Sequence, residues 1–238
     1  MVFGAVLAGG VGSRMKMADM PKQFLPLGDK PIIIHTVEKF LLCPEIDIVC
    51  VGVNPQWVSH MNELVDEFIS DKERVRVIPG GADRNGTIFN VVDAIEGEFG
   101  EDDNHIIVTH DAVRPFVTLR IIRDNIEAAR KYGACDTVVG ATDTIVMSTD
   151  GEKISDIPPR SAMYQGQTPQ SFKITKLKEV FASLTEEEKA TLTDACSIYV
   201  RKNLDVYLVQ GEVANMKITT ITDYNIVQAM LGCLEIEE

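Results

Sequence analysis

Short apolar runs alternate along the chain with segments in which apolar residues recur every three to four positions. The apolar runs predict buried strands at residues 2–7, 46–53, 74–78, 105–109, 136–141 and 206–209. The helical spacing predicts helices at 31–42, 57–68, 88–95, 118–132, 175–183 and 222–231, and a short charged helix from residue 185. Strands and helices in alternation are typical of α/β proteins. Because no linker or repeat divides the chain, we predict one α/β domain over residues 1–238.

One segment breaks this alternation. Residues 144–157 alternate polar and apolar positions on either side of the turn Thr149-Asp150-Gly151-Glu152, which predicts a β-hairpin. An isolated hairpin is marginally stable in water, so its apolar positions need a partner surface. We therefore predict a dimerisation β-arm at about residues 142–166.

A glycine-rich loop follows the first predicted strand and reads Leu7-Ala8-Gly9-Gly10-Val11-Gly12-Ser13-Arg14-Met15. Glycines let the backbone turn tightly and approach a ligand closely, and successive N–H groups in such a loop suit a phosphate. Arg14 and Lys22 add two cations, which a phosphoryl transition state needs. The loop predicts a nucleotide-phosphate site, although a glycine-rich turn without a ligand is the simpler alternative.

Two other phosphate loops fit this sequence less well. The pattern G-x-x-x-x-G-K-[ST] fails because Pro31 follows Lys30, and the dinucleotide fingerprint G-x-G-x-x-G fails at Met15. An oxidoreductase that uses a dinucleotide cofactor is therefore disfavoured.

A second loop, around Gly81, Asp83 and Thr87, opens a predicted helix and also carries Arg84. A helix N-terminus preceded by glycines can bind an anion or a polar ligand group, and Asp83 can serve as its N-cap at the same time. Asp111 follows the strand at 105–109, at the edge of the sheet where ligands bind in open α/β folds. A single carboxylate beside phosphates suits Mg²⁺, although Asp111 in a turn is the structural alternative.

Charge and composition narrow the classes of partner. The formal net charge of −13 argues against nonspecific nucleic-acid binding, which needs a basic face. No apolar run approaches the ~20 residues that span a bilayer, so no membrane partner is expected. The five cysteines are scattered, and the N-terminus lacks the pattern of a signal peptide, which favours a cytoplasmic protein.

Several segments occur in an order that resembles the cytidylyltransferases that make CDP-polyols. They are the first loop with Pro21-Lys22-Gln23, then Gly80 to Arg84, His110 to Pro115, Asp143-Thr144-Ile145, Gln167 to Phe172 and Asn215 to Thr219. Each segment alone is a weak or moderate signal, and their order makes the resemblance strong. The resemblance implies a Rossmann-like fold with a mostly parallel mixed sheet flanked by helices, a projecting β-arm, a homodimer, and Mg²⁺ as cofactor. It also implies CTP and a polyol phosphate as substrates.

The same resemblance implies residue roles. It implies that Arg14, Lys22 and Lys217 are catalytic and that Asp111 binds the metal. Nucleotide binding falls to Leu7, Ala8, Gly9, Gly10, Gly12, Gly81, Asp83, Thr87 and Ala112. Arg114, Thr144 and Arg160 are expected to bind the polyol phosphate. Of these, Arg160 is expected to contribute to the site of the partner subunit.

The acceptor is harder to predict. Met163 to Gln167 and Thr193 to Cys196 look like the branch that uses ribitol 5-phosphate in teichoic-acid synthesis, and Val113 stands where the methylerythritol enzymes commonly have alanine. We therefore expect ribitol 5-phosphate, with 2-C-methyl-D-erythritol 4-phosphate as the alternative. A non-catalytic nucleotide-binding module is an alternative of another class, and the cations of the first loop argue against it.

Overall fold

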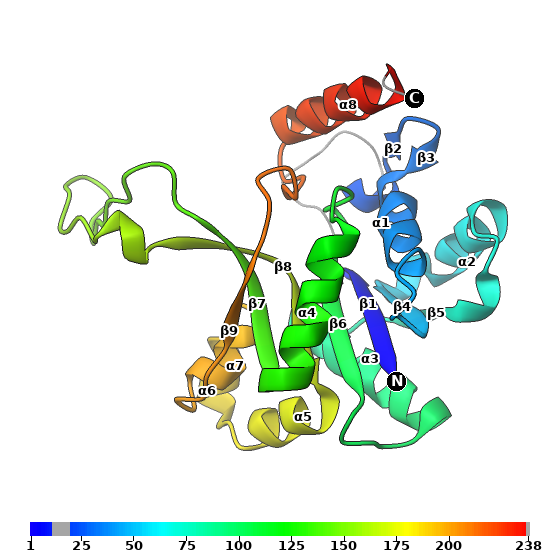
Figure 1. The fold of residues 1–238 in the computed structure, drawn as a ribbon, viewed down its shortest axis with the longest axis horizontal. Helices are drawn as coiled ribbons and strands as arrows, with labels where there is room; N and C mark the ends of the chain where they lie inside the picture. Colours follow the sequence, from blue (N-terminus) through cyan, green and yellow to red (C-terminus); the bar gives the residue numbers. More distant parts are fainter. Residues whose placement is uncertain (11–19, 237–238) are drawn as a thin grey trace.

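The computed structural model describes residues 1–10 and 20–236. Seven strands form one sheet in the order β5-β4-β1-β6-β8-β7-β9 (Figure 1). Neighbouring strands run parallel except at β8, which is antiparallel to both β6 and β7. Their bounds are β1 Val2–Ala8, β4 Ile48–Val53, β5 Val75–Pro79, β6 Ile106–Asp111, β7 Ala134–Gly140, β8 Tyr164–Lys173 and β9 Tyr207–Gln210. The predicted mostly parallel mixed sheet is confirmed.

Helices cover both faces of the sheet. One apolar cluster joins the sheet to α1 (Ile32–Leu41), α2 (Val58–Phe68) and α4 (Leu119–Tyr132). The other joins it to α3 (Arg84–Phe99), α5 (Ile174–Ala182) and α7 (Cys196–Val200). Along β1, Val2 and Val6 belong to the first cluster and Phe3 and Ala5 to the second, as the period of two in a strand requires. Both faces of β1 are therefore core, which explains its continuous apolar sequence.

A third apolar cluster attaches the end of the chain beside the first loop. It joins α8 (Ile221–Ile236) to the small hairpin of β2 (Pro26–Leu27) and β3 (Lys30–Pro31) through Leu27, Tyr224 and Val227. The Tyr224 hydroxyl also donates to the carbonyl oxygen of Pro26. Asp223 accepts from the backbone N–H groups of Thr219 and Thr220, which fixes the turn into α8. The segment that carries Lys217 is thus held close to the segment that carries Lys22.

The sequence did not predict β8, and the small hairpin and α7 were also missed. β8 lies between β6 and β7, although it contains Gly166, Pro169 and several polar residues that are uncommon inside sheets. Its buried Gln170 and Ser171 bond to neighbouring side chains, which offsets the cost of burying them. The α1 helix begins at Ile32, with Pro31 as its N-cap, one residue later than predicted.

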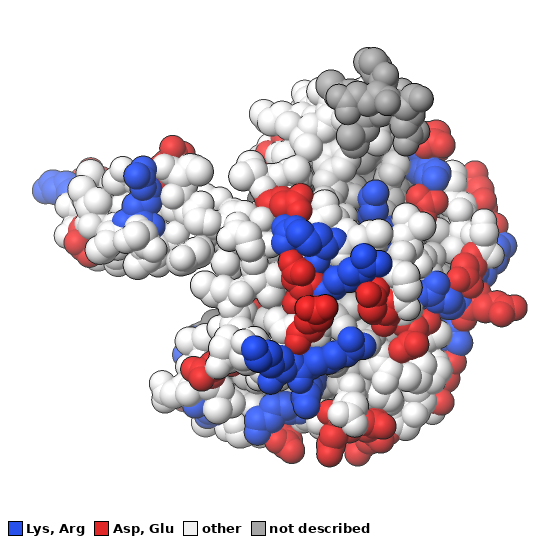
Figure 2. All heavy atoms as spheres, viewed as in Figure 1, with Lys and Arg blue, Asp and Glu red and all other residues white. Residues whose placement is uncertain are grey.

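The predicted hairpin is present only in outline. Residues 141–163 form a long excursion between β7 and β8 that projects from the body (Figure 1), and Figure 2 shows it as a separate lobe. Antiparallel pairing is limited to one bridge, Met147 with Asp156. The prediction of a regular two-stranded hairpin at 144–157 is therefore wrong. The turn is held by Asp150, whose carboxylate accepts from the N–H groups of Glu152 and Lys153. No other element among the described residues packs against this segment, and alternating polar and apolar residues alone do not stabilise a regular ladder of hydrogen bonds between two strands.

On the face of the body drawn in Figure 2, acidic and basic side chains are interspersed, and neither charge dominates. Within the described residues, no helix combines the length and apolar character that a membrane crossing requires.

Candidate nucleotide-binding and catalytic site

A cavity of about 650 Å³ opens at the carboxyl ends of the parallel strands. This is the edge at which open α/β sheets bind ligands. Its walls come from the loops after β1, β4, β5 and β6 and from the segment before α8. The lining residues are Leu7, Ala8, Gly9, Gly10, Lys22, Gln23, Asn54, Pro55, Gly80, Gly81, Ala82, Asp83, Arg84, Thr87, Asp111, Ala112, Val113 and Lys217. Two loops far apart in the sequence therefore face one space, as expected.

The first wall is the start of the glycine loop. Gln23, which is buried in the 3-10 helix η1 (Lys22–Phe24), donates from Nε2 to the carbonyl oxygens of Ala8 at 2.8 Å and Gly10 at 3.3 Å. A Cβ on Gly9 would lie 2.9 Å from the Thr87 hydroxyl oxygen, so only glycine fits there. The hydrogen bonds from Gln23 thus fix the backbone of this loop where it lines the cavity.

The second wall is built around Thr87, which is 1% exposed. Its hydroxyl accepts from the N–H of Gly81 at 3.1 Å and donates to the carbonyl oxygen of Asp83 at 2.9 Å. The Asp83 carboxylate accepts from the N–H of Gly86 at 2.7 Å, which confirms Asp83 as the N-cap of α3. A Cβ on Gly52 would lie 2.5 Å from the Thr87 methyl group, so the threonine fills a space that β4 leaves open.

Asp111 lies at the centre of the charges. Its Oδ2 is 2.9 Å from Lys217 Nζ and 3.5 Å from Arg114 Nε, and its Oδ1 is 3.5 Å from Arg84 Nε. Burial alone would raise the pKa of this carboxyl, but the charges of Arg84, Lys217 and Arg114 outweigh burial and hold the pKa well below its ordinary value. Asp111 is therefore an anion throughout the physiological range.

A buried hydrogen-bond chain fixes the backbone under Asp111. Because the carbonyl oxygen of Arg114 can only accept, His110 carries its hydrogen on Nε2, which lies 3.1 Å from that oxygen. His110 Nδ1 then accepts from the Thr168 hydroxyl at 2.9 Å, and the same hydroxyl accepts from the N–H of Asp111 at 3.1 Å. Burial lowers the pKa of His110 to about 4, so the ring is neutral. His110 is therefore a structural residue.

The two lysines come from opposite ends of the chain. Lys22 Nζ donates to the carbonyl oxygen of Ile218 at 2.7 Å, while the N–H of Ile218 donates to the carbonyl oxygen of Val113 at 3.0 Å. The Lys217 side chain remains 45% exposed while it contacts Asp111. Both ammonium groups therefore reach the cavity that Asp111 lines.

The structure brings most of the predicted site residues together. Leu7, Ala8, Gly9, Gly10, Lys22, Gly81, Asp83, Thr87, Asp111, Ala112 and Lys217 all line the cavity. Gly12 and Arg14 lie outside the described residues. Arg114 is buried behind Asp111, where its Nη1 donates to the carbonyl oxygen of Asn215 at 2.7 Å. Thr144 and Arg160 lie on the arm and do not line this cavity, and Arg160 Nη1 donates to the carbonyl oxygen of Thr142.

Other lining residues were missing from the predicted site. Gln23 stood in the sequence segment that carries the resemblance, so its role could have been inferred from its position beside Lys22. Arg84 was noticed only as a charge on the second loop, and Asn54 follows the strand predicted at 46–53 without having been singled out. No local pattern indicates that Arg84 contacts Asp111, because that contact depends on the sheet.

Cations gathered around one carboxylate, beside a loop that presents its backbone to the cavity, are what nucleotidyl transfer needs, and they place this protein among the nucleotidyltransferases. Residues 2–233 match the model of the family described as IspD: 2-C-methyl-D-erythritol 4-phosphate cytidylyltransferase. The chain belongs to this family.

Relatives and solved structures agree with this assignment. The chain is 52% identical over 232 residues to a Ribitol-5-phosphate cytidylyltransferase of Streptococcus pneumoniae serotype 2, covering 97% of this chain and 99% of that protein. Among crystal structures, the 4-diphosphocytidyl-2C-methyl-D-erythritol synthase of Anaerococcus prevotii matches with a TM-score of 0.80 at 24% identity, over 98% of this chain and 96% of its own. The cytidylyltransferase of Francisella tularensis matches with a TM-score of 0.78 at 23% identity, over 96% and 98%. These likenesses confirm the Rossmann-like cytidylyltransferase fold.

Proposed function

We propose that this protein transfers the cytidylyl group of CTP to D-ribitol 5-phosphate, giving CDP-ribitol and pyrophosphate. The observation that carries the proposal is the 52% identity, over almost the full length of both chains, to a protein named for that reaction. Supply of CDP-ribitol to teichoic-acid or capsule synthesis in the cytoplasm belongs to the same proposal. The alternative acceptor, 2-C-methyl-D-erythritol 4-phosphate, is supported by the family description.

The chemistry needs positioning and charge compensation. The phosphate monoester of the acceptor, with a charge of about −1.5 to −2, is itself the nucleophile. One of its oxygens forms a bond to the α-phosphorus of CTP while the bond from that phosphorus to the bridging oxygen breaks, and pyrophosphate carries the electron pair away. Two polyanions must be brought into line, so cations contribute most of the rate. In this proposal Lys22, Lys217 and Arg14 offset the charge that develops at the α-phosphate.

The nucleotide would lie between the two loops. The backbone of Ala8, Gly9 and Gly10 would face the phosphates, and the wall at Gly81 and Asp83 would face the cytosine and its ribose. The N–H of Gly81 is already bonded to Thr87, so in this arrangement Thr87 would shape the pocket, and the remaining groups of the loop would contact the base.

The residues present fit a magnesium ion. Asp111 offers one ionised carboxylate at the cavity, and Mg²⁺ is commonly held by one or two carboxylates together with phosphate oxygens and water. Bound there, the ion would neutralise charge on the triphosphate. Arg114 and Lys217 would keep Asp111 in place on its other oxygen.

A homodimer through the arm is part of the proposal. The arm and its base expose several large apolar side chains within one chain: Val146, Met147, Ile154, Ile157 and Tyr164. A second subunit would cover them, and Thr144 and Arg160 would then reach the acceptor phosphate in the site of the partner. Mixing Lys22→Ala protein with Arg160→Ala protein tests this. Activity should return in the mixture, because a mixed dimer has one intact site, and no recovery would contradict the shared site.

The reaction itself is tested by pyrophosphate release with CTP and Mg²⁺, with ribitol 5-phosphate and methylerythritol 4-phosphate in parallel. Sites that read hydroxyl groups discriminate strongly, so one acceptor should be preferred by orders of magnitude. Turnover with the methylerythritol ester alone would reverse the choice of acceptor. Binding of CTP without release from either acceptor would favour a nucleotide-binding module.

A further inference from the structure

The segment that carries Lys217 is tied to the turn after β6 on both sides of that lysine. Two residues before it, the carbonyl oxygen of Asn215 accepts from Arg114 Nη1 at 2.7 Å. One residue after it, the N–H of Ile218 donates to the carbonyl oxygen of Val113 at 3.0 Å. These two hydrogen bonds end on adjacent residues of the turn, so they fix the backbone from which the Lys217 side chain extends.

Arg114 also contacts the group that receives the Lys217 ammonium. Its Nε lies 3.5 Å from Asp111 Oδ2, the same oxygen that lies 2.9 Å from Lys217 Nζ. The donors of an arginine form a planar fork, so one guanidinium group can hold two acceptors at once. Arg114 therefore contacts both the carboxylate that binds the end of Lys217 and the backbone just before Lys217.

Both partners of this contact are buried. Asn215 is 0% exposed, and its Nδ2 donates to the carbonyl oxygen of Thr168 at 2.8 Å and to Gln167 Oε1 at 3.2 Å. Arg114 is 8% exposed and is not among the described residues that line the cavity. The resemblance implies that Arg114 binds the polyol phosphate, whereas its Nε and Nη1 contact the protein itself.

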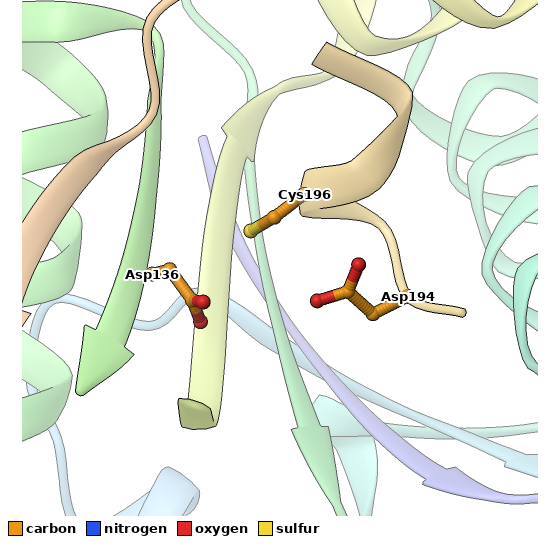
Figure 3. A group of neighbouring side chains, drawn as sticks. All are labelled: Asp136, Asp194 and Cys196. Carbon is orange, nitrogen blue, oxygen red and sulfur yellow. The ribbon is translucent and has the colours of Figure 1, made fainter. Parts of the chain in front are cut away.

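The strand to which Asn215 bonds is itself anchored. Gln170 of β8, which is 3% exposed, donates from Nε2 to Asp136 Oδ1 at 3.1 Å and to Asp194 Oδ2 at 2.8 Å. Figure 3 shows these two aspartates, from β7 and from the turn before α7, beside Cys196. Because β8 is held to both elements, it gives Asn215 a fixed surface to bond.

We propose that Arg114 and Asn215 form a clamp that positions the ammonium group of Lys217 relative to Asp111 and the bound substrates. Both are positioning residues, because they act on the reaction through Lys217. The inference rests on the proposed function, in which Lys217 offsets charge at the α-phosphate, and it names what holds that charge in place. A misplacement of about 1 Å can cost roughly a hundredfold in rate, so loss of the clamp should be visible in kcat.

Initial rates of pyrophosphate release test the clamp, with CTP and with the acceptor that the unmodified protein prefers. In Arg114→Met and in Asn215→Ala, kcat should fall about tenfold while KM for CTP and for the acceptor change by less than about threefold. The matched controls are Arg74→Met, an arginine that bonds backbone carbonyl groups outside the cavity, and Asn125→Ala, a buried amide on α4. Both controls should keep kcat within about twofold.

Double variants with Lys217→Ala separate positioning from a general structural effect. A clamp that acts through Lys217 has nothing left to position once that side chain is removed. Each clamp substitution should then lower kcat by less than about twofold further. A further tenfold loss would overturn the inference, and so would a near-normal kcat in Lys217→Ala alone. A raised KM for the acceptor with an unchanged kcat in Arg114→Met would make Arg114 a phosphate ligand and would also overturn it.

Hydrogen exchange tests the clamp without turnover. The amide of Ile218 should exchange about tenfold faster in each clamp variant and at the original rate in both controls. Unchanged exchange at Ile218 in the clamp variants would overturn the inference; if Asn215→Ala does not fold, Arg114→Met decides in the same way. If the unmodified protein releases no pyrophosphate with either acceptor, the proposed function fails, and the exchange rates still decide whether the clamp holds this segment.

Discussion

Replacing Thr87 by valine would test whether one hydroxyl supports the wall of the nucleotide cavity. Valine has nearly the shape of threonine, so the packing against Gly9 and Gly52 is retained and no cavity forms. What disappears is the acceptor for the N–H of Gly81 and the donor to the carbonyl oxygen of Asp83. The substitution therefore isolates the two hydrogen bonds from the volume of the side chain.

The magnitude follows from the burial of these groups. A hydrogen bond contributes about 1 kcal/mol net, and a buried donor left without a partner costs about 1–3 kcal/mol. Gly81 is only partly buried, so we expect the free energy of unfolding to fall by about 2 kcal/mol. For a chain of this size, that loss lowers Tm by about 4–8 °C. Because the backbone at Gly81 is no longer fixed, KM for CTP should rise about fivefold, with kcat nearly unchanged.

Thermal unfolding and initial rates at varied CTP would measure both effects. The control is Thr191→Val, which removes an exposed hydroxyl that donates to the carbonyl oxygen of Glu188 at 3.0 Å and lies outside the cavity. It should change Tm by less than about 2 °C, as exposed substitutions usually do. If Thr87→Val matched this control in both Tm and KM, the hydroxyl would not support the wall, and the role given to the second loop would be refuted.

Three further predictions concern the charges and the buried histidine. Lys22→Ala should lower kcat by roughly a hundredfold or more with the fold intact, while loss of its hydrogen bond to the carbonyl oxygen of Ile218 lowers Tm modestly. A near-normal kcat would remove Lys22 from catalysis. Arg160→Ala should raise KM for the polyol phosphate, and an effect on CTP alone would contradict its placement. His110 has a pKa of about 4 in the folded protein. The unfolded chain thus binds its proton first as pH falls, and up to roughly 3 kcal/mol of stability is lost between about pH 6.5 and 4. His110→Gln should flatten that part of the stability curve measured by urea unfolding, and an unchanged slope would contradict the neutral ring.

The parallel part of the sheet could be predicted because its strands are buried on both faces. A strand such as β1 then needs apolar residues at nearly every position, and the resulting run stands out in the sequence. β8 is equally central, but its side chains reach polar partners such as Asn125 and Asp136, which are distant in the sequence. Its sequence therefore resembles a loop. On the arm, the alternation of polar and apolar residues was visible in the sequence, but such alternation does not by itself indicate whether two strands pair.

The site divides in the same way. The glycine loop and the N-cap at Asp83 are local, so spacing alone reveals them. The contact of Arg84 with Asp111 and the link from Asp136 to Asp194 through Gln170 join residues on different strands and helices. The strand order β5-β4-β1-β6-β8-β7 brings these elements together. Sequence reasoning therefore found the groups that line the cavity more readily than the contacts that hold them in place.

His110 shows how the proposed reaction proceeds without a histidine as general base. It adjoins Asp111 at the end of β6, and in the sequence a histidine there could be taken for a proton acceptor. In the fold it is 0% exposed, and its two ring nitrogens are engaged by Thr168 and by the carbonyl oxygen of Arg114. Among the described residues that line the cavity, none is a histidine or a cysteine. A phosphate monoester is already ionised and attacks without losing a proton, so a base would add nothing. The histidine instead holds the backbone of Asp111 and Arg114. In the proposed reaction, the cations around that carboxylate would act on the substrates.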